Sequence, residues 1–268
     1  MNIRLLGTGA ADGIPGFFGN DPVSRHAREF GGKDVRTRSA ALIDGVVKID
    51  FPPDTLNQLQ RDRLDALDWT GLVFTHSDDD HFAVNELQYA LFPFTDLDHL
   101  PYTIYANWQI CSEIRCRYPD WPMELSETRS FEGFEHGAYQ IMPVKATHIA
   151  DEDCHNLIFQ REGKTLLYAT DTGIWPKETF DFLRSYKLDL LVLECTDGVN
   201  ESIYAGHLNI ESVKQVVSEL RTAGVLHSGS RVVTTHHGRN GDVTHCQLEK
   251  LLSPSGIEPG YDSMLIEI

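Results

Sequence analysis

The sequence predicts a layered α/β protein, in which helices cover sheets of short strands. Apolar runs of strand length alternate with segments of helical periodicity along the whole chain. Some runs, such as Leu188–Glu194, are almost continuously apolar, as expected for strands covered on both faces. No repeat and no linker rich in Pro, Gly or Ser interrupts the 268 residues, so we expect a single domain spanning 1–268.

The N-terminal half contains the following expected elements, each bounded by turn residues or helix-start signals. Residues 2–6 form a strand that ends in a small-residue loop, Gly7–Pro15, whose glycine spacing does not match a dinucleotide-binding fingerprint. Residues 16–38 are polar and basic and predict a long surface loop. The remaining elements are a hairpin over 39–50 around Asp44-Gly45, a helix from Pro52 to about Leu64, a strand over 71–75, a helix over 82–91, a strand over 103–105 and a helix over 108–117.

The C-terminal half continues the alternation. Strands are expected at 138–144, 155–160 and 165–169, then a helix from Pro176 to about Tyr186 and a strand over 188–194. Asn209 or its neighbours cap a helix that reaches about Ala223, and its apolar stripe faces a core. The last predicted strand is 231–235.

Composition restricts the class of protein. A hydrophobic content of 41% suffices for a substantial core, and no apolar run reaches membrane-spanning length. The apolar run at the N-terminus is too short for a signal peptide. The five cysteines are scattered and none has Cys-x-x-Cys spacing, which favours reduced thiols and a cytoplasmic location.

The net charge disfavours a nucleic-acid polymer as substrate. The chain carries 23 basic and 40 acidic residues, a balance of −17, and such a surface repels phosphate backbones. One basic segment, Arg25–Arg38, is the exception. We expect it to serve a small anion, with Arg36 or Arg38 binding a phosphate through the planar guanidinium group.

The segment Thr75–His81 combines two imidazoles with three carboxylates directly after an apolar run. Without a cation, carboxylates this close repel one another and their pKa values rise. An acidic, solvated helix start is the alternative explanation. However, His148, Asp171 and His236 also each follow an apolar strand, so four strand exits carry ligand-type side chains toward what can be one rim. The pattern therefore predicts a metal site.

The spacing His76-x-Asp78-x-Asp80-His81, followed by His148, Asp171 and His236, resembles the metallo-β-lactamase superfamily. The usual first motif of that superfamily is His-x-His-x-Asp-His. The resemblance implies a four-layer αββα sandwich with a two-metal site along one edge. Within the superfamily the chain looks most like the cyclic-phosphate phosphodiesterases of the carbon–phosphorus lyase pathway, on the segments Gly7–Pro15, Arg38–Ala40, Gly206-His207 and Gly260–Met264 and on Asp171 with its flanking threonines.

The resemblance also implies roles for single residues. One metal would be held by His76, Asp78 and His148, and the second by Asp80, His81 and His236. Asp171 would bridge the two ions, and His207 matches the position of a proton donor. His237 and His245 have no ligand counterpart and are expected to be supporting or surface histidines.

Two departures from the family pattern bear on the metals. Asp78 replaces the usual second histidine, which makes the first site harder and favours Mn²⁺ or Fe over Zn²⁺ there. In related enzymes the loop after Pro15 can carry a cysteine-based structural zinc. Here that loop has no cysteine, and Arg239 stands where a further histidine is expected, so we predict no structural zinc. The two divalent ions implied by the resemblance remain the expected cofactors.

The expected activity is hydrolysis of a small phosphodiester, such as a cyclic nucleotide or cyclic sugar phosphate, by a hydroxide bridging two metal ions. Asp80 and Asp171 would hold the metals, and His207 would protonate the leaving alkoxide. A lactonase or thioesterase on the same scaffold is the alternative enzyme, a tRNA-processing nuclease is a weaker one, and a catalytically impaired metal-binding protein is the non-enzymatic alternative. We expect no membrane partner, and a homodimer is left open.

Overall fold

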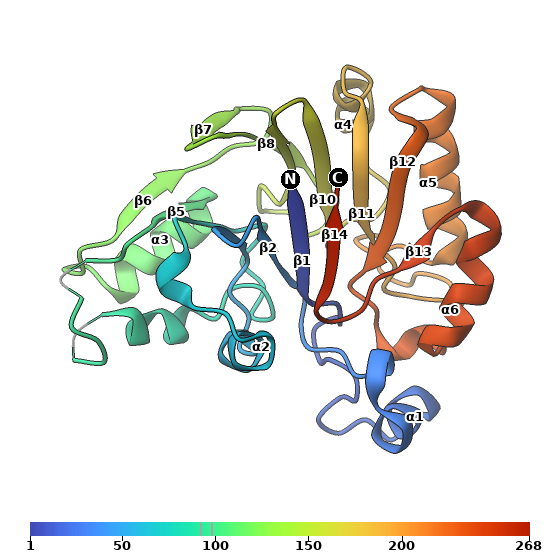
Figure 1. Ribbon diagram of the computed structural model, residues 1–268, viewed down its shortest axis with the longest axis horizontal. Helices are drawn as coiled ribbons and strands as arrows, with labels where there is room; N and C mark the ends of the chain where they lie inside the picture. The colour runs from blue at the N-terminus through green and yellow to red at the C-terminus, as the bar shows by residue number, and fades with distance from the viewer. Residues whose placement is uncertain (92, 98) are drawn as a thin grey trace.

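The computed structural model describes residues 1–91, 93–97 and 99–268, and its strands form two seven-stranded sheets. The first sheet has the order β14 (Met264–Glu267), β1 (Asn2–Gly7), β2 (Ala40–Ile43), β3 (Val47–Ile49), β4 (Gly71–Val73), β5 (Thr103–Ala106) and β6 (Glu124–Glu127). The second has the order β13 (Glu258–Pro259), β12 (Leu226–Thr235), β11 (Leu188–Glu194), β10 (Lys164–Ala169), β9 (His155–Arg161), β8 (Tyr139–Lys145) and β7 (Phe134–His136). The N-terminal strand β1 and the C-terminal strand β14 lie side by side (Figure 1).

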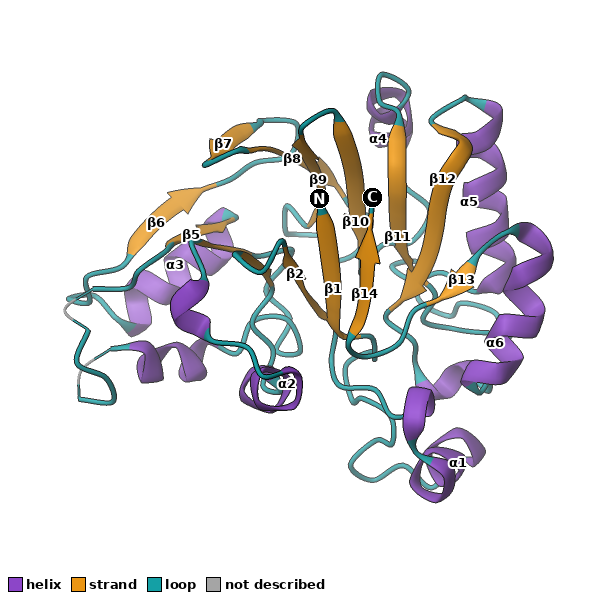
Figure 2. Ribbon diagram, viewed as in Figure 1, coloured by secondary structure: helices purple, strands orange, loops and turns teal. Residues whose placement is uncertain are grey.

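Helices lie on the outside of both sheets (Figure 2). The α-helices are α1 (Pro22–Phe30), α2 (Thr55–Asp62), α3 (Trp108–Arg117), α4 (Lys177–Leu183), α5 (Ile210–Thr222) and α6 (His245–Leu252). Short 3₁₀ segments complete the structure: η1 (Gly32–Asp34), η2 (Ala66–Asp68), η3 (Val84–Ala90), η4 (Arg239–Gly241) and η5 (Ser253–Ser255). No helix among the described residues combines the length and the apolar character needed to cross a bilayer.

Three layers of buried apolar side chains hold these elements together. The central layer joins the two sheets and includes Val73 from β4 and Tyr168 from β10. A second layer packs Ile110 of α3 against the first sheet, and a third packs the α5 stripe, including Val213 and Leu220, against the second sheet. Each fully buried aliphatic side chain stabilises the fold by about 1.5–3 kcal/mol. The predicted four-layer αββα sandwich is confirmed.

Parallel pairing brings the strand exits to one edge. In the first sheet β3 and β4 run parallel, and in the second β10, β11 and β12 run parallel with Leu193 paired to both Ala169 and Thr234. The residues that follow these strands therefore meet at the same edge. The backbone N–H of His155 donates to the carbonyl of Thr75 at 2.9 Å, which ties the two sheets together there.

The prediction of a loop over residues 16–38 was wrong, because this segment contains α1 and η1. The signals for the helix were present: Asp21 caps it by accepting a hydrogen bond from the Ser24 N–H at 2.8 Å, and Pro22 occupies its first turn. Val23 and Ala27 are buried against Ile14. A stripe this narrow in a polar segment gives too weak a periodic pattern to reveal the helix from sequence.

Candidate metal centre

The side chains that leave the strand exits converge around Asp171. Its Oδ2 lies 3.0 Å from His81 Nε2, and its Oδ1 lies 3.2 Å from His236 Nε2. The same Oδ1 is 3.7 Å from His148 Nε2 and 4.0 Å from His76 Nε2. Asp171 thus has imidazole nitrogens on both sides, which is the position a bridging carboxylate needs.

The other two carboxylates divide the cluster into two groups. Asp78 Oδ2 lies 3.1 Å from His148 Nε2 and 3.5 Å from His76 Nε2. Asp80 Oδ2 lies 3.2 Å from His81 Nε2 and 3.6 Å from the Nε2 of His236. This is the division expected from the sequence, with the Asp78 group more open to solvent than the buried Asp80 group. The role of these residues as ligands stays a prediction.

All four cluster imidazoles point Nε2 inward because Nδ1 is held by a group outside the cluster. The Nδ1–H of His81 donates to Asp50 at 2.8 Å, and that of His148 donates to the Gly206 carbonyl at 3.2 Å. The Thr75 hydroxyl donates to Asp50, so it accepts from the Nδ1–H of His76 at 3.0 Å. The Thr196 hydroxyl likewise donates to Glu194 and accepts from the Nδ1–H of His236 at 2.8 Å. With Nδ1 held in this way, each Nε2 is directed into the cluster, where it can bind a metal ion.

The donor set fits divalent cations. His76 Nε2 is buried and has no hydrogen-bond partner, which is costly unless a cation occupies the space it faces. Burial alone would lower the pKa of His81, yet Asp171, Asp80 and Asp50 raise it well above its ordinary value. The cluster therefore attracts positive charge. A mixed set of imidazoles and carboxylates suits Zn²⁺, Fe and Mn²⁺.

The pKa values of the cluster carboxylates move opposite to the expectation from crowding. Burial alone would raise the pKa of Asp171 and of Asp80, but the neighbouring histidines hold both well below their usual range. The neighbouring His148 and His76 imidazoles lower the pKa of Asp78 as well. The heptapeptide itself supplies His76 and His81, but the further imidazoles of His148 and His236 come from distant strands. All three aspartates are therefore ionised and ready to bind a cation.

Sequence reasoning missed two buried carboxylates that hold this arrangement in place. Asp50 accepts from the Thr75 N–H at 2.8 Å as well as from His81. Glu194 accepts from the backbone N–H groups of Thr172 and Leu208 at 2.8 and 2.9 Å. Each follows or ends an apolar strand, β3 or β11, and that position was the signal that could have revealed them.

Glu194 also orients His207. The His207 Nδ1–H donates to Glu194 Oε1 at 2.8 Å, which leaves Nε2 free. A ring nitrogen of His207 lies within 4.8 Å of possible ligand atoms of Asp171 and His236. Burial alone would lower the pKa of His207, but the Glu194 carboxylate raises it to about 9. His207 is therefore protonated at neutral pH and able to donate a proton.

Backbone strain is concentrated at the same place. Asp50, Asp171 and His236 have φ values of 57°, 46° and 53°, in the left-handed region that non-glycine residues rarely occupy. Each such residue costs on the order of 1 kcal/mol or more. The surrounding hydrogen bonds maintain this conformation, which places the side chains of Asp171 and His236 in the cluster.

The expected phosphate-binding role of Arg36 and Arg38 is corrected by the structure. Arg36 is buried and donates to the Thr8 hydroxyl and the Gly260 carbonyl, both at 2.7 Å, while its Nη2 lies 3.0 Å from His245 Nδ1. Arg38 pairs with Asp54 at 3.1 Å. Neither arginine lines the pocket over the cluster. Sequence shows that a residue is basic, but it does not show that its guanidinium group already bonds to acceptors within the protein.

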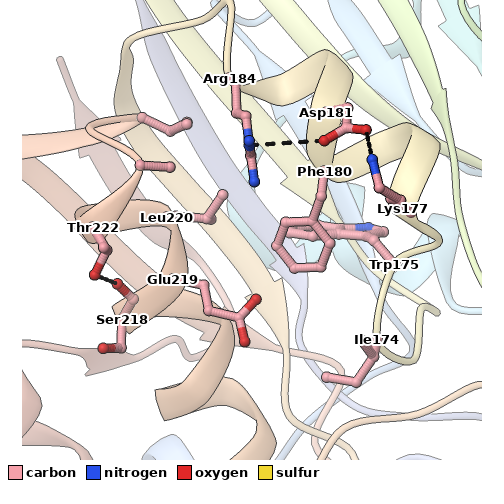
Figure 3. Close-up of a pocket in the computed structure, with 12 residues that line it drawn as sticks. Ile174, Trp175, Lys177, Phe180, Asp181, Arg184, Ser218, Glu219, Leu220 and Thr222 are labelled. Atoms are coloured by element: carbon pink, nitrogen blue, oxygen red, sulfur yellow. Dashed lines mark hydrogen bonds and ion pairs between the residues drawn. The ribbon is translucent and has the colours of Figure 1, made fainter.

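The cluster opens into a pocket of about 450 Å³. Its wall outside the cluster contains Ala10, Ala11, Asp12, Thr196, Asp197, Asn200, Glu201, Ile203, Tyr204, His207 and Asn240. A larger hollow of about 760 Å³ lies between α4 and α5 (Figure 3), but it contains no histidine, and Asp181 there is paired with Lys177 and Arg184. The chemistry therefore belongs to the smaller pocket.

Comparisons with known proteins agree with this geometry. The family model of the beta-lactamase superfamily domain matches residues 41–237, which include every predicted metal ligand. Among curated proteins, no sequence matches the chain.

Solved structures with the same fold cover the whole chain. A diphosphatase of the PhnP family superposes with a TM-score of 0.78 at 20% identity, over 100% of this chain and 97% of that one. Zn²⁺-bound PqqB from Methylobacterium extorquens gives 0.77 at 16% identity over 100% of both chains, and the short form of human tRNase Z gives 0.68 at 17% over 100% of this chain and 99% of that one. At these identities the likeness shows the fold alone. The chain belongs to the metallo-β-lactamase superfamily of metal-dependent hydrolases.

Proposed function

We propose that the protein is a metal-dependent phosphodiesterase that hydrolyses a small phosphodiester. The observation that carries this proposal is the pairing of a dinuclear-type cluster with His207, an imidazole that Glu194 holds beside it through a hydrogen bond of 2.8 Å. Divalent ions held by the cluster would supply Lewis-acid polarisation of a phosphoryl oxygen. The sandwich fold shared with a PhnP-family diphosphatase supports the same reaction class.

The roles of the side chains follow from their positions. Asp171, between the two groups of ligands, would hold both ions at a fixed separation. His207 lines the pocket with its Nε2 free, so it would give a proton to the alkoxide that leaves phosphorus. Glu194 keeps the ring in this orientation and favours the charged form. The pocket admits a small molecule, which supports a compact diester rather than a polymer.

A substrate panel on the metal-loaded protein tests the proposal. We expect hydrolysis of bis-p-nitrophenyl phosphate to exceed that of lactones and thioesters by at least about 100-fold in kcat/KM, because two divalent ions held by the cluster would stabilise the charge on the phosphoryl oxygens. The reverse order would identify a carbon-ester hydrolase. Bound metal without turnover of any ester would identify a binding protein.

A further inference from the structure

One wall of the pocket is formed by residues 199–206, here called the wall segment, which lies between β11 and α5. It contains no helix or strand, and all of its residues except Ser202 and Gly206 are exposed. Glu201, Ile203 and Tyr204 from this segment line the pocket. A segment with so few buried contacts depends on specific bonds to keep one conformation.

The bonds that hold the wall segment lead to His148, one of the predicted metal ligands. The Tyr204 hydroxyl donates to the His148 carbonyl, and the His148 Nδ1–H donates to the Gly206 carbonyl at 3.2 Å. Within the described part of the chain, residues 201–206 make no other hydrogen bond to a distant segment. The wall segment and His148 therefore hold each other in place.

Close packing of rings accompanies these two bonds. The centroid of the Tyr204 ring lies 5.5 Å from that of His148 and 5.6 Å from that of His207. A Cβ atom at Gly206 would lie 2.3 Å from Tyr204 Cε1 and 2.8 Å from His148 Nδ1, closer than a Cβ atom can approach either. The glycine is therefore required for the Tyr204 ring to reach the two imidazoles.

The wall segment also packs against the strand exit that carries Asp171. A Cβ atom at Gly173, two residues after Asp171, would lie 1.7 Å from the Ala205 carbonyl oxygen. The Gly173 N–H donates to the Thr147 carbonyl at 2.8 Å, so the exits of β8 and β10 are joined to each other. The wall segment, which leads directly into His207, is thus fitted to both exits.

We propose that Tyr204 is a positioning residue that holds His148 and the segment leading into His207 as one unit. The Tyr204 hydroxyl fixes the backbone of His148, and its ring packs against the imidazole, so His148 Nε2 stays directed at Asp78. The carbonyl that accepts from His148 belongs to Gly206, the residue before His207, so the same contacts fix the proton donor relative to the first group of ligands. The part that concerns His207 rests on the proposed phosphodiesterase function.

Metal binding tests the effect on His148 independently of activity. Calorimetric titration of the metal-free protein with Mn²⁺ compares the wild type with Tyr204→Phe and Tyr204→Ala. Tyr204→Phe removes one hydrogen bond, so the Kd of one Mn²⁺ ion should rise by about 3- to 10-fold. Tyr204→Ala also removes the ring and should raise this Kd by about 10- to 100-fold, the effect of losing a group that orients a ligating histidine. Tyr89 is the matched control, because both tyrosines are 47% exposed and Tyr89 does not line the pocket, so Tyr89→Phe should leave the Kd unchanged.

The dependence on the leaving group tests the effect on His207. With the metal sites saturated, Tyr204→Phe should lower kcat on 2′,3′-cyclic AMP, which releases an alkoxide, by about 3- to 10-fold. The loss on bis-p-nitrophenyl phosphate should stay below about 2-fold, because p-nitrophenolate leaves without a proton. Equal losses on the two substrates would overturn the link between Tyr204 and His207.

The outcomes separate this proposal from the function on which it rests. Metal affinity and kcat equal to those of the wild type in the Tyr204 variants would overturn the proposal while leaving phosphodiesterase activity intact. Weaker metal binding in a protein that hydrolyses neither substrate would support the role of Tyr204 at His148 and overturn the phosphodiesterase function. If Tyr204→Ala does not fold, Tyr204→Phe decides the proposal alone.

Discussion

Replacing His207 with Ala should reduce turnover in a way that depends on the leaving group. Glu194 holds Nδ1 of the protonated ring and leaves Nε2 free, so the substitution removes a proton donor. General acid catalysis contributes about 100- to 10,000-fold. An alkoxide needs the proton, whereas p-nitrophenolate is a stable anion. We therefore expect a loss of at least about 100-fold on an alkyl phosphodiester and less than about 10-fold on bis-p-nitrophenyl phosphate.

The measurement is kcat on both substrates, with elemental analysis of the same samples. The His207 ring also lies within ligand distance of Asp171 and His236, so the alternative role is metal binding. Metal content equal to that of the wild type, together with the unequal losses, supports the proton donor. Equal losses on the two substrates, or loss of an ion, would refute the reasoning and make His207 a ligand.

Four further predictions follow from the same structure. Glu194→Gln removes the carboxylate that raises the pKa of His207 to about 9, so the alkaline fall in kcat should move to lower pH; an unmoved limb in the pH profile would contradict this. Asp171→Ala should lower kcat by more than about 1,000-fold and remove at least one ion by elemental analysis, and retention of two ions at full rate would exclude bridging. Asp78→His should shift competitive metal binding toward Zn²⁺, and an unchanged profile would show that either ligand serves. Burial lowers the pKa of Lys48 from 10.5 to about 7, so between these pH values the unfolded chain binds more protons than the native protein. The free energy of unfolding, measured in urea, should therefore rise with pH in this interval by about 1.4 kcal/mol per pH unit relative to Lys48→Met. A constant difference between the two proteins would contradict the argument.

The layered fold and the cluster were predictable because strand exits are visible in sequence. An apolar run followed at once by ligand-type residues marks both the strand and its site-bearing end, as at Thr75–His81 and at His236. Parallel pairing then brings those ends together. Asp50 and Glu194 carry the same strand-end signal, but their roles as hydrogen-bond acceptors depend on residues far along the chain and do not show in sequence.

The errors share a physical cause. The basic segment was assigned to phosphate binding from its charge, but burial gives Arg36 internal acceptors and Asp54 pairs with Arg38. Helix α1 was missed because its buried residues are only Val23, Ser24 and Ala27, which give a weak periodic pattern. The cap by Asp21 was the one clear signal for this helix. Local sequence signals identify most helices and strands, whereas the partner of a charged side chain depends on tertiary contacts.

Titration of the metal-free protein with Mn²⁺, followed by hydrolysis of bis-p-nitrophenyl phosphate, tests the central claim most directly. The account predicts no activity before metal is added and a rate that reaches its plateau at about two equivalents per chain, as two-metal catalysis requires. Activity in the fully metal-free protein, or no hydrolysis at any metal loading, would contradict it.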